Sequence, residues 1–372
     1  MLDINNVCVV GGGNTGVALA VDISQRKNVT LLTSKAGCMQ SVLEKLDTDT
    51  NEIQYGRNIK VTASFQEAYK NADMIVVTLP SFCIKKFAEE INGYNPKIIL
   101  FIPGFGGKEF YMQDMKKKGC IIAGFDRSLY ICRLETPVKV KASKKKSIRL
   151  ACLGSENVEI ISEEVGKIMA VNCEPLKNYL TVTFTPSNPI LHTARLYSMF
   201  READFTTKFP RMIKFYAEWT NESSDLLLNM DNELHKICNA ITDFDLSGVI
   251  PLSKYYESDT VEKMTKKITT IKSWHEMNSP MVEIDGSFYI DSKSRYFEED
   301  FLYGLLILKS FVEILKVDTP YMNKVLKWYG NLAQLELLDN NNNLKVEKLT
   351  QYPILQNFDI YDIKNIQKFY NN

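Results

Sequence analysis

The 372-residue sequence lacks the features that mark several classes of protein. It has no apolar run long enough to cross a membrane, and its N-terminus has neither the charged start nor the apolar core of a secretory signal peptide. Its 45 basic and 45 acidic residues cancel, so there is no overall basic excess to attract nucleic acid. We therefore expect a cytoplasmic protein that binds neither membranes nor nucleic acid.

The cysteine pattern excludes two further classes. Eight cysteines are scattered along the chain, with no C-x-x-C motif and no clustered set of Cys and His. Scattered thiols are typical of reduced cytosolic proteins rather than of disulfide frameworks or zinc sites. We predict no metal site. The length is sufficient for two domains, and the oligomeric state stays open, with a homodimer as one alternative.

A glycine-rich segment near the N-terminus gives the clearest positive signal. Residues 7–10 form an apolar run that leads into Gly11, Gly13 and Gly16, in the pattern G-x-G-x-x-G, and residues 17–23 have a helical pattern. A strand, a tight glycine turn and a helix in this order are typical of a dinucleotide-binding loop, where the helix N-terminus faces the pyrophosphate. The alternative is a glycine turn in another α/β domain. The predicted cofactor contacts of this loop are Gly11, Gly13, Asn14, Thr15 and Gly16.

The end of the second predicted strand bears on the choice of cofactor. An NAD-binding fold usually has Asp or Glu there to hold the ribose 2′-hydroxyl, whereas this chain has Thr33, Ser34 and Lys35. A hydroxyl and an ammonium group suit a 2′-phosphate better, so we predict that NADP is preferred over NAD. The alternative is that Lys35 is simply solvated.

Further apolar strands follow, alternating with helical stretches. The strand at 73–78 ends beside Leu79 and Pro80, and others are predicted at 97–102, 120–125 and, as the last of this domain, 147–154. Alternation of this kind predicts a doubly wound, Rossmann-type parallel sheet. Because ligands lie at the carboxyl ends of such strands, we expect Leu79 and Pro80 to contact the cofactor.

Two segments of the remaining chain bear on its organisation. The lysine-rich residues 137–150 alternate as in a strand, and we interpret them as a solvated hairpin rather than a nucleic-acid patch because no aromatic residues interleave. Helical patterns dominate after residue 181, at 226–241, 260–271, 300–315 and 319–338. We therefore predict a dinucleotide-binding domain at 1–180 and a mainly α-helical substrate domain at 181–372.

Several short motifs together resemble the octopine/nopaline (opine) dehydrogenase family. Asn188-Pro-Ile-Leu-His192 is similar to that family's Asn-Pro-Leu-Leu-His motif, and Arg295-Tyr-Phe-Glu-Glu-Asp300 is similar to its Arg-Tyr-x-x-Glu-Asp motif. Weaker similarities lie at Tyr216-Ala-Glu218, Asp231-x-Glu233, Pro103-Gly104-x-Gly106-Gly107 and Tyr130-x-Cys132-Arg133. The chain departs from the family at Asp126 and Leu129, where members often carry Glu and Pro.

The resemblance implies a specific reaction and specific residue roles. Members reductively condense the amine of an amino acid with a 2-keto acid, often pyruvate, using NADH or NADPH, and bind the substrates in a cleft between the two domains. Carried over, His192 is the general acid and base, Asp300 its partner, and Arg295 and Asn188 substrate-binding residues. The helical domain is expected to be of the 6-phosphogluconate dehydrogenase type.

The residue chemistry agrees with these roles. Histidine exchanges protons near neutral pH, and an Arg matches the planar carboxylate of a keto acid. His192 is expected in a loop, and Arg295 is expected to precede the helix, because a gap of five residues does not place Arg295 and Asp300 on one helical face. Arg195 is a second candidate for binding a carboxylate. The alternative functions are a hydroxy-acid dehydrogenase without an amine substrate and a non-catalytic NADP-binding sensor.

Overall fold

The computed structural model describes residues 3–39, 42–154, 157–185 and 188–371. The chain divides into two compact units, one formed by residues 1–183 with 368–372 and the other by residues 184–367. We refer to them as the first and second units. The last helix thus ends in the first unit. The assignment of a dinucleotide-binding domain to residues 1–180 and a substrate domain to residues 181–372 stays a prediction.

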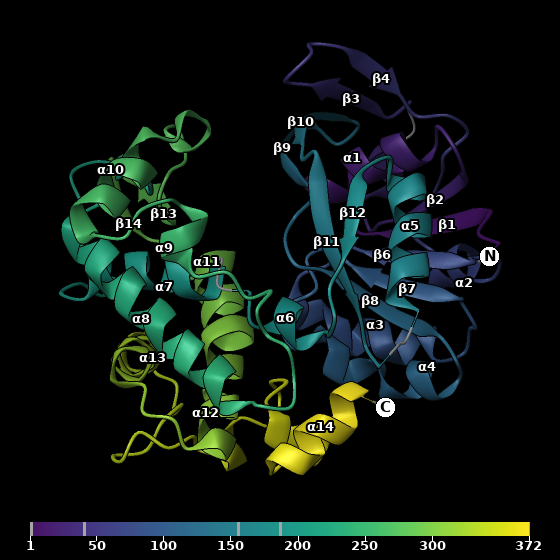
Figure 1. Cartoon of the computed structure of the whole chain (residues 1–372). Coiled ribbons are helices and arrows are strands. Elements are labelled where there is room, and N and C mark those ends of the chain that lie inside the picture. The colour runs from purple at the N-terminus through teal and green to yellow at the C-terminus, as the bar shows by residue number, and fades with distance from the viewer. Residues whose placement is uncertain (1–2, 40–41, 155–156, 186–187, 372) are drawn as a thin grey trace. The chain divides into compact units, whose positions relative to one another are not determined.

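The first unit is organised around a mostly parallel sheet, which the described residues form with eight strands in the order β12-β11-β8-β7-β6-β1-β2-β5 (Figure 1). Its strands are β1 (Asn6–Val10), β2 (Asn28–Leu32), β5 (Lys60–Thr62), β6 (Met74–Val77), β7 (Ile98–Phe101), β8 (Ile121–Phe125), β11 (Ser147–Cys152) and β12 (Asn172–Pro175). Its helices are α1 (Asn14–Ile23), α2 (Phe65–Tyr69), α3 (Ile84–Ile91), α4 (Gln113–Lys117), α5 (Val158–Met169) and α6 (Leu180–Thr183), with short 3₁₀ turns η1 (Ala36–Cys38), η2 (Ser81–Cys83) and η3 (Lys108–Met112).

The central strands explain why the sheet was predictable. Every residue of β6 and β7 is buried, as are the last four residues of β1. Strands covered on both faces have continuous apolar sequences and not alternating ones. β1 pairs in parallel with both β2 and β6, so the strand order changes direction beside the glycine loop.

The far end of the sheet corrects one prediction. β11 was expected to be the last strand of this domain, but α5 follows it and leads to β12, which pairs with β11 in parallel. β11 itself runs antiparallel to β8. The sequence pattern missed β12 because its four residues, Asn-Cys-Glu-Pro, are largely exposed and polar, as suits a sheet edge.

A second, smaller sheet packs on α1 in the order β4-β3-β10-β9. Its strands are β3 (Glu44–Asp47), β4 (Ile53–Tyr55), β9 (Tyr130–Thr136) and β10 (Lys139–Lys144). The hairpin predicted at 137–150 is wrong in its pairing, because β10 pairs with the preceding strand β9, whereas β11 belongs to the large sheet. The lysine-rich strand β10 is also not fully solvated, because Lys144 donates to the buried carboxylate of Asp22 at 2.8 Å. Lys45 and Tyr130 also donate to Asp22, which ties α1 to three strands of this sheet.

The second unit is mainly helical, as predicted. Its helices are α7 (Asn188–Phe200), α8 (Asn221–Ala240), α9 (Leu252–Tyr255), α10 (Val261–Thr270), α11 (Arg295–Phe297), α12 (Leu306–Leu315) and α13 (Pro320–Ala333), joined by the π-helix η5 (Glu298–Leu305) and the 3₁₀ turns η4 (Lys272–Trp274), η6 (Val346–Lys348) and η7 (Leu355–Phe358). The last helix, α14 (Ile363–Asn371), begins in this unit and ends in the first. A hairpin of β13 (Met281–Ile284) and β14 (Ser287–Ile290) completes the second unit (Figure 1).

Two buried acids of α8 hold the starts of other helices. Glu233 accepts hydrogen bonds from the backbone N–H groups of Tyr321 and Met322, each at 2.8 Å, at the start of α13. Asp231 accepts from the backbone N–H of Leu252 at 2.7 Å, at the start of α9. The first N–H groups of a helix have no partner within the helix, so these carboxyl groups supply acceptors from a neighbouring helix. The Asp231-x-Glu233 motif therefore has a structural explanation.

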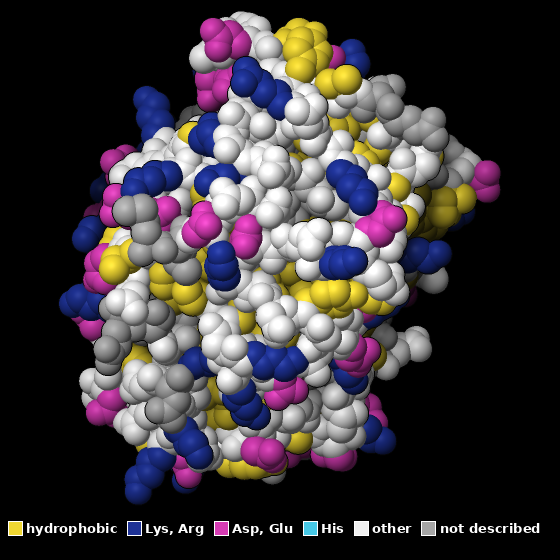
Figure 2. All heavy atoms as spheres, turned by 90° about the vertical axis from the view of Figure 1, so that its right-hand side faces the viewer, with side chains coloured by type: hydrophobic (Ala, Val, Ile, Leu, Met, Phe, Trp, Pro, Cys, Tyr) yellow, Lys and Arg dark blue, Asp and Glu magenta, His cyan; other side chains and the backbone are white. Residues whose placement is uncertain are grey.

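The surface agrees with the net charge of zero. Basic and acidic side chains are interspersed over the face shown in Figure 2. Within the described residues, no helix is both long and apolar enough to cross a membrane.

Asp231 generates a prediction about stability. Burial raises the pKa of its carboxyl group from 3.8 to about 7. Because the folded pKa lies above the unfolded one, stability is lost as pH rises from about 4 to about 7. Asp231→Asn stays neutral and keeps an acceptor for Leu252. Even a tenfold difference in proton affinity between the folded and unfolded chains is worth about 1.4 kcal/mol. We therefore expect the difference in Tm between Asp231→Asn and the wild type to increase by at least roughly 3–5 °C, in favour of the variant, when the pH is raised from 4 to 7.5.

Asp225→Asn is the matched control, since Asp225 is an exposed aspartate of the same helix. Thermal unfolding at a series of pH values measures both differences. The prediction is contradicted if the difference in Tm between the wild type and Asp231→Asn is the same at both ends of the pH range.

Candidate active site

The glycine loop has the geometry of a dinucleotide-binding turn. Gly11 follows β1 with φ of +110°, a value that L side chains rarely adopt. A Cβ atom at Gly16 would lie 1.7 Å from the carbonyl oxygen of Gly11, so only glycine allows α1 to pack so closely on the end of β1. Two of the three predicted glycine roles are thus visible in the backbone.

Gly13 has the third role. It is the N-cap residue of α1, and no described side chain caps this end of the helix. No described atom lies within 4 Å of a Cβ built at Gly13, so the space in front of the first helical turn is open. Open space at a helix N-terminus, with backbone N–H groups directed into it, suits the pyrophosphate of NAD or NADP. The loop therefore fits the predicted cofactor.

The polar side chains of this loop are used within the protein. Asn14 accepts a hydrogen bond from the backbone N–H of Leu134 at 2.9 Å, and the hydroxyl of Thr15 lies 3.7 Å from the sulfur of Cys132. Both partners belong to β9. Asn14 and Thr15, predicted as cofactor contacts, thus fasten the start of α1 to the small sheet through their side chains. Their backbone N–H groups remain at the helix start.

The end of β2 separates the three residues predicted to select the cofactor. Thr33 is buried, its hydroxyl accepts from the backbone N–H of Lys35 at 3.1 Å, and it would lie 2.4 Å from a Cβ at Gly12. Ser34 and Lys35 are exposed. Thr33 therefore packs beneath the glycine loop, while Ser34 and Lys35 are the residues of this turn that can meet a phosphate.

The loop after β6 lies against the glycine turn. A Cβ at Gly11 would be 3.4 Å from the side chain of Leu79, and the hydroxyl of Thr78 donates to the carbonyl of Val10 at 3.0 Å. Leu79 and Pro80 are both half-buried. The predicted cofactor residues of β1 and β6 are therefore neighbours at one edge of the sheet.

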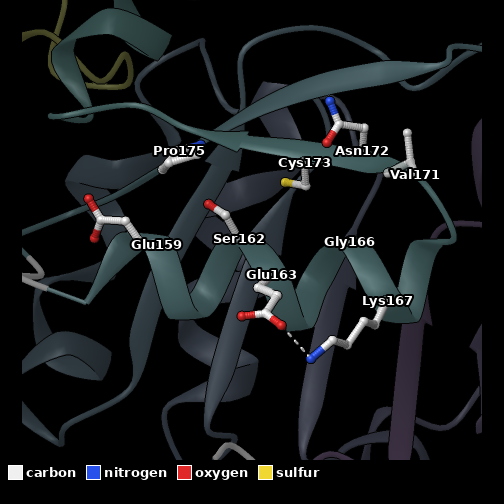
Figure 3. A pocket seen from close by; sticks show the side chains of 9 residues that line it. All are labelled: Glu159, Ser162, Glu163, Gly166, Lys167, Val171, Asn172, Cys173 and Pro175. Atoms are coloured by element: carbon white, nitrogen blue, oxygen red, sulfur yellow. Dashed lines mark ion pairs between the residues drawn. The ribbon is translucent and has the colours of Figure 1, made fainter.

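Two hollows in the first unit lie outside these contacts. A groove of about 400 Å³ runs between α5 and β12, where Ser162 and Cys173 extend into the space between helix and strand (Figure 3). None of the predicted site residues lines this groove. A larger hollow of about 620 Å³ is lined by residues that include Ala36 and Met39, which follow Lys35 in the chain, and Val61, which pairs with Leu31 of β2.

In the second unit, the structure brings together the two residues predicted to handle protons. The Nδ1 atom of His192 lies 2.8 Å from a carboxylate oxygen of Asp300, and both side chains are buried. His192 lies on α7, so its predicted loop position is wrong. A Cβ at Gly304 would lie 3.0 Å from Pro189, so a glycine in η5 allows the two helices to approach closely enough for this contact.

The start of the helix corrects the argument about Arg295. Arg295 does not precede the helix but begins α11, which continues directly into η5 and α12. Arg295 is exposed and Asp300 is buried, so the two side chains differ in their access to solvent. The expectation failed because the predicted helix began at residue 300, whereas the helical segment begins five residues earlier.

Arg295 and Asn188 are placed differently from the buried pair. Arg295 is exposed, and in the described part of the chain no side chain forms an ion pair or hydrogen bond with its guanidinium. Burial raises the pKa of the Asp300 carboxyl group overall, while His192 and, to a smaller extent, the charge of Arg295 oppose this rise. Asn188 is the half-buried first residue of α7, one helical turn before His192.

Tyr216 completes the arrangement. Its hydroxyl lies 2.8 Å from Nε2 of His192, so both ring nitrogens of the histidine have partners. The sequence contained Tyr216 in one of its weaker family motifs but gave no reason to connect it with His192. Only the fold brings together residues that are 24 positions apart.

Arg195, the second candidate for binding a carboxylate, is used internally. Its guanidinium donates to the carbonyl of Phe215 at 2.9 Å, to that of Glu218 at 2.7 Å and to the hydroxyl of Ser223 at 3.2 Å. Arg195 is buried. It therefore holds the turn that carries Tyr216 rather than a substrate.

Comparison with known proteins identifies the family. Residues 175–333 match the model of the NAD/NADP octopine/nopaline dehydrogenase α-helical domain, and residues 6–115 match that of the NAD-dependent glycerol-3-phosphate dehydrogenase N-terminus. An opine dehydrogenase of Haliotis discus hannai is 26% identical over 87% of this chain and 88% of its own. The helical domain of this chain belongs to the octopine/nopaline (opine) dehydrogenase family. The predicted class, an NAD(P)-dependent oxidoreductase, follows from this membership.

The relatives and neighbours extend over nearly the whole chain. The octopine dehydrogenase of Pecten maximus is 25% identical over 87% of this chain and 88% of its own. The structure of an octopine dehydrogenase with NADH and L-arginine has a TM-score of 0.82 at 21% identity, covering 97% of each chain. A yersinopine dehydrogenase with NADP⁺ bound has a TM-score of 0.72 at 13% identity. These likenesses confirm the predicted fold class.

The glycine loop generates a paired prediction. Gly16→Ala forces a Cβ against the Gly11 carbonyl, so we expect it to lower stability by about 1–3 kcal/mol, the usual cost of overpacking. Gly13→Ala meets no protein atom and should leave Tm unchanged. Its methyl group would stand where the pyrophosphate approaches, so we expect the Kd for NADPH and NADH to rise roughly tenfold or more.

Thermal unfolding without cofactor and fluorescence titration with each nucleotide measure the two effects. Each variant serves as the control for the other. Wild-type nucleotide affinity in Gly13→Ala would show that the pyrophosphate lies elsewhere.

Proposed function

We propose that this protein is an opine dehydrogenase that uses NAD(P)H to condense a 2-keto acid such as pyruvate with an amino acid or another amine. The observation that carries the proposal is the buried contact between His192 and Asp300, which supplies a proton-transfer group held by a carboxylate. Family membership supplies the reaction class. The eight free cysteines fit a reducing compartment, and we place the protein in the cytoplasm.

The reaction demands proton transfer in two places. The amine adds to the keto carbon to give a carbinolamine, and loss of water then gives an imine. When bound, NADPH or NADH would supply the hydride that reduces this imine to the secondary amine. The keto oxygen must receive a proton during addition, and the departing oxygen must receive another during dehydration. A histidine can give and recover both near neutral pH.

Asp300 keeps His192 ready for this work. A carboxylate at Nδ1 fixes the orientation of the ring and stabilises the imidazolium form when it arises. Burial of both groups strengthens their interaction because little water screens it. We infer that Nδ1 carries its proton toward Asp300, which leaves Nε2 to exchange protons with the reacting groups.

Arg295 and Asn188 are proposed to bind the substrates. The exposed guanidinium of Arg295 has no competing partner among the described residues, and its planar donors match a keto-acid carboxylate in a bidentate manner. Asn188 lies one turn before His192 on α7, so its amide can hydrogen-bond a substrate held near the imidazole.

We propose NADPH as the preferred cofactor, with NADH as the alternative. Ser34 and Lys35 stand at the end of β2 in place of the acid that would repel a 2′-phosphate. Leu79 and Pro80 complete the proposed contacts beside the glycine loop.

The function is tested by following NAD(P)H oxidation with pyruvate and a panel of amino acids and amines, using both cofactors. We expect oxidation that requires the keto acid and the amine together. Oxidation with the keto acid alone would indicate a hydroxy-acid dehydrogenase. Cofactor binding without any oxidation would indicate a sensor, and a strong preference for NADH would contradict the role of Ser34 and Lys35.

His192 and Asp300 generate a prediction about coupled losses. Loss of general acid–base catalysis typically costs 10²–10⁴ in rate, so His192→Gln should lower kcat by about that factor and leave NADPH affinity unchanged. Asp300→Asn should lower kcat nearly as much. The double variant should be little worse than either single one, because groups that act as a unit are not additive.

His275→Gln is the matched control, since the ring of this exposed histidine of the second unit has the Thr269 carbonyl as its one hydrogen-bond partner among the described residues. Steady-state kinetics on the most active amine measure all four variants. Losses that multiply in the double variant would show that the two residues act separately, and near-normal kcat in His192→Gln would remove the histidine from the reaction.

Arg295 generates a separate prediction about substrate affinity. Arg295→Lys keeps the charge but loses the bidentate geometry, so we expect the KM for the keto acid to rise roughly tenfold or more. NADPH affinity should hardly change. An unaltered keto-acid KM together with weaker cofactor binding would assign Arg295 to the cofactor instead.

A further inference from the structure

Tyr216 closes the side of His192 that faces away from Asp300. Its hydroxyl is 2.8 Å from Nε2, and the tyrosine is only 5% exposed. With Nδ1 bound to Asp300, neither ring nitrogen of His192 is open for a direct contact with another molecule. Either Tyr216 moves aside when substrates bind, or protons reach the imidazole through its hydroxyl.

The packing around Tyr216 argues against movement. The centroid of its ring lies 4.4 Å from that of Trp274 and 4.8 Å from that of Phe215. The ring of Trp219 is nearly parallel to it, with a centroid distance of 6.3 Å. Such aromatic contacts add to the stabilisation already gained from burial. Displacing the ring would break them together.

The backbone is held as firmly as the ring. Arg195 binds the carbonyl groups of Phe215 and Glu218, one residue before and two residues after Tyr216. Rearranging this turn would cost free energy, because the buried N–H donors of the Arg195 guanidinium would lose their two carbonyl acceptors. Tyr216 is therefore fixed from both sides of the chain.

We propose that Tyr216 is a catalytic residue that carries protons between Nε2 of His192 and the substrate oxygen. The proposal rests on the proposed function, since it adds a third member to the same proton-handling unit. Burial raises the pKa of the Tyr216 hydroxyl well above 10. The hydroxyl therefore keeps a proton at neutral pH and acts as a neutral donor and acceptor.

The proton balance for dehydration is as follows. The Tyr216 hydroxyl gives its proton to the leaving oxygen of the carbinolamine, whose carbon–oxygen bond breaks to release water. In the same step, Nε2 of the imidazolium gives its proton to the tyrosine oxygen, so no phenolate forms. The amine nitrogen supplies the electron pair of the new carbon–nitrogen double bond. The positive charge thus moves from the imidazolium to the iminium product, and His192 is left neutral with its Nδ1 proton on the Asp300 side.

The kinetic test uses pyruvate and the most active amine of the screen. Tyr216→Phe removes only the hydroxyl, and we expect kcat to fall by about 10², within the usual range for lost acid–base catalysis. The KM for pyruvate and the Kd for NADPH should stay within about threefold of the wild type. The double variant Tyr216→Phe/His192→Gln should be no slower than His192→Gln alone, because a relay without its histidine has nothing left to lose.

Tyr296→Phe is the matched control. Its ring also packs on that of His192, with centroids 4.8 Å apart, but both ring nitrogens are already paired with Asp300 and Tyr216. We expect its kcat to stay within about threefold of the wild type. A purely structural effect of removing a tyrosine hydroxyl near the histidine would affect both variants.

A second measurement does not depend on turnover. The chain has three histidines, so ¹⁵N-histidine labelling with His192→Gln as the assignment reference isolates the signals of one ring. At a pH where this ring is neutral, we expect the tautomer with the proton on Nδ1, and we expect the Nε2 signal to shift in Tyr216→Phe. This readout remains informative if Tyr216→Phe is poorly active because it is less stable.

The outcomes separate this inference from the proposed function. Loss of activity in His192→Gln with near-normal kcat in Tyr216→Phe would overturn the relay and leave the proposed function intact. Near-normal activity in His192→Gln would overturn the histidine's role itself. A neutral His192 protonated on Nε2, or an additional loss in the double variant, would also overturn the relay.

Discussion

The arrangement of α7 and η5 in the second unit depends on the buried carboxyl group of Asp300, which lies in a largely apolar helical segment and contacts His192. Removing a charged group from water is costly unless it is paired, and burial accordingly raises the pKa of Asp300. The pairing requires α7 to approach η5 closely enough for His192 to reach it. Glycine at position 304 permits that approach, because Pro189 fills the space that a side chain would need. The π-helical turn is where this acid and this glycine both lie.

Three buried acids of this unit show how partners distinguish structural roles from chemical ones. Glu233 and Asp231 accept hydrogen bonds from backbone N–H groups at the starts of two helices, and such partners do not exchange protons during a reaction. Asp300 lies at hydrogen-bond distance, 2.8 Å, from an imidazole that can exchange protons, whereas the imidazole of His235 lies 3.8 Å from Asp231, beyond that distance. Desolvation raises the pKa of all three carboxyl groups, so this property alone does not identify the reactive one. The partner does.

The sequence predicted the parts of the fold that rest on local pattern. Strands such as β6 and β7 have continuous apolar sequences because both of their faces are buried, and Gly11 and Gly16 have backbone requirements that no other residue meets. His192, Asp300 and Arg295 were found through short motifs. The contact between the first two is a property of packing that the motifs alone do not contain.

What the sequence missed depends on contacts between distant residues or on unusual helical geometry. The small sheet pairs β3 with β10, which lie about a hundred residues apart, and no periodicity predicts such a partner. The π-helix was missed because a 3.6-residue period was assumed. No local motif predicts that Tyr216 lies beside His192, because the position of Tyr216 is set by an aromatic cluster and by Arg195, which the sequence suggests as a carboxylate binder instead.

The type of a polar residue therefore indicates its function less well than its existing hydrogen bonds do, because a side chain already bonded within the protein is not available to a ligand. Asn14, Thr15 and Thr33 are polar residues at a phosphate-binding turn, yet their side chains bind β9 or pack beneath the glycine loop. Ser34 and Lys35, by contrast, are exposed, which is why the proposed function assigns the selection between the two nucleotides to them. The same distinction separates the two arginines. Arg195 is occupied by carbonyl groups of the Tyr216 turn, whereas the guanidinium of Arg295 is exposed and has no hydrogen-bond partner among the described residues. A buried polar group must be satisfied within the protein, so the side chains that remain exposed and unpaired are the ones that can bind a substrate.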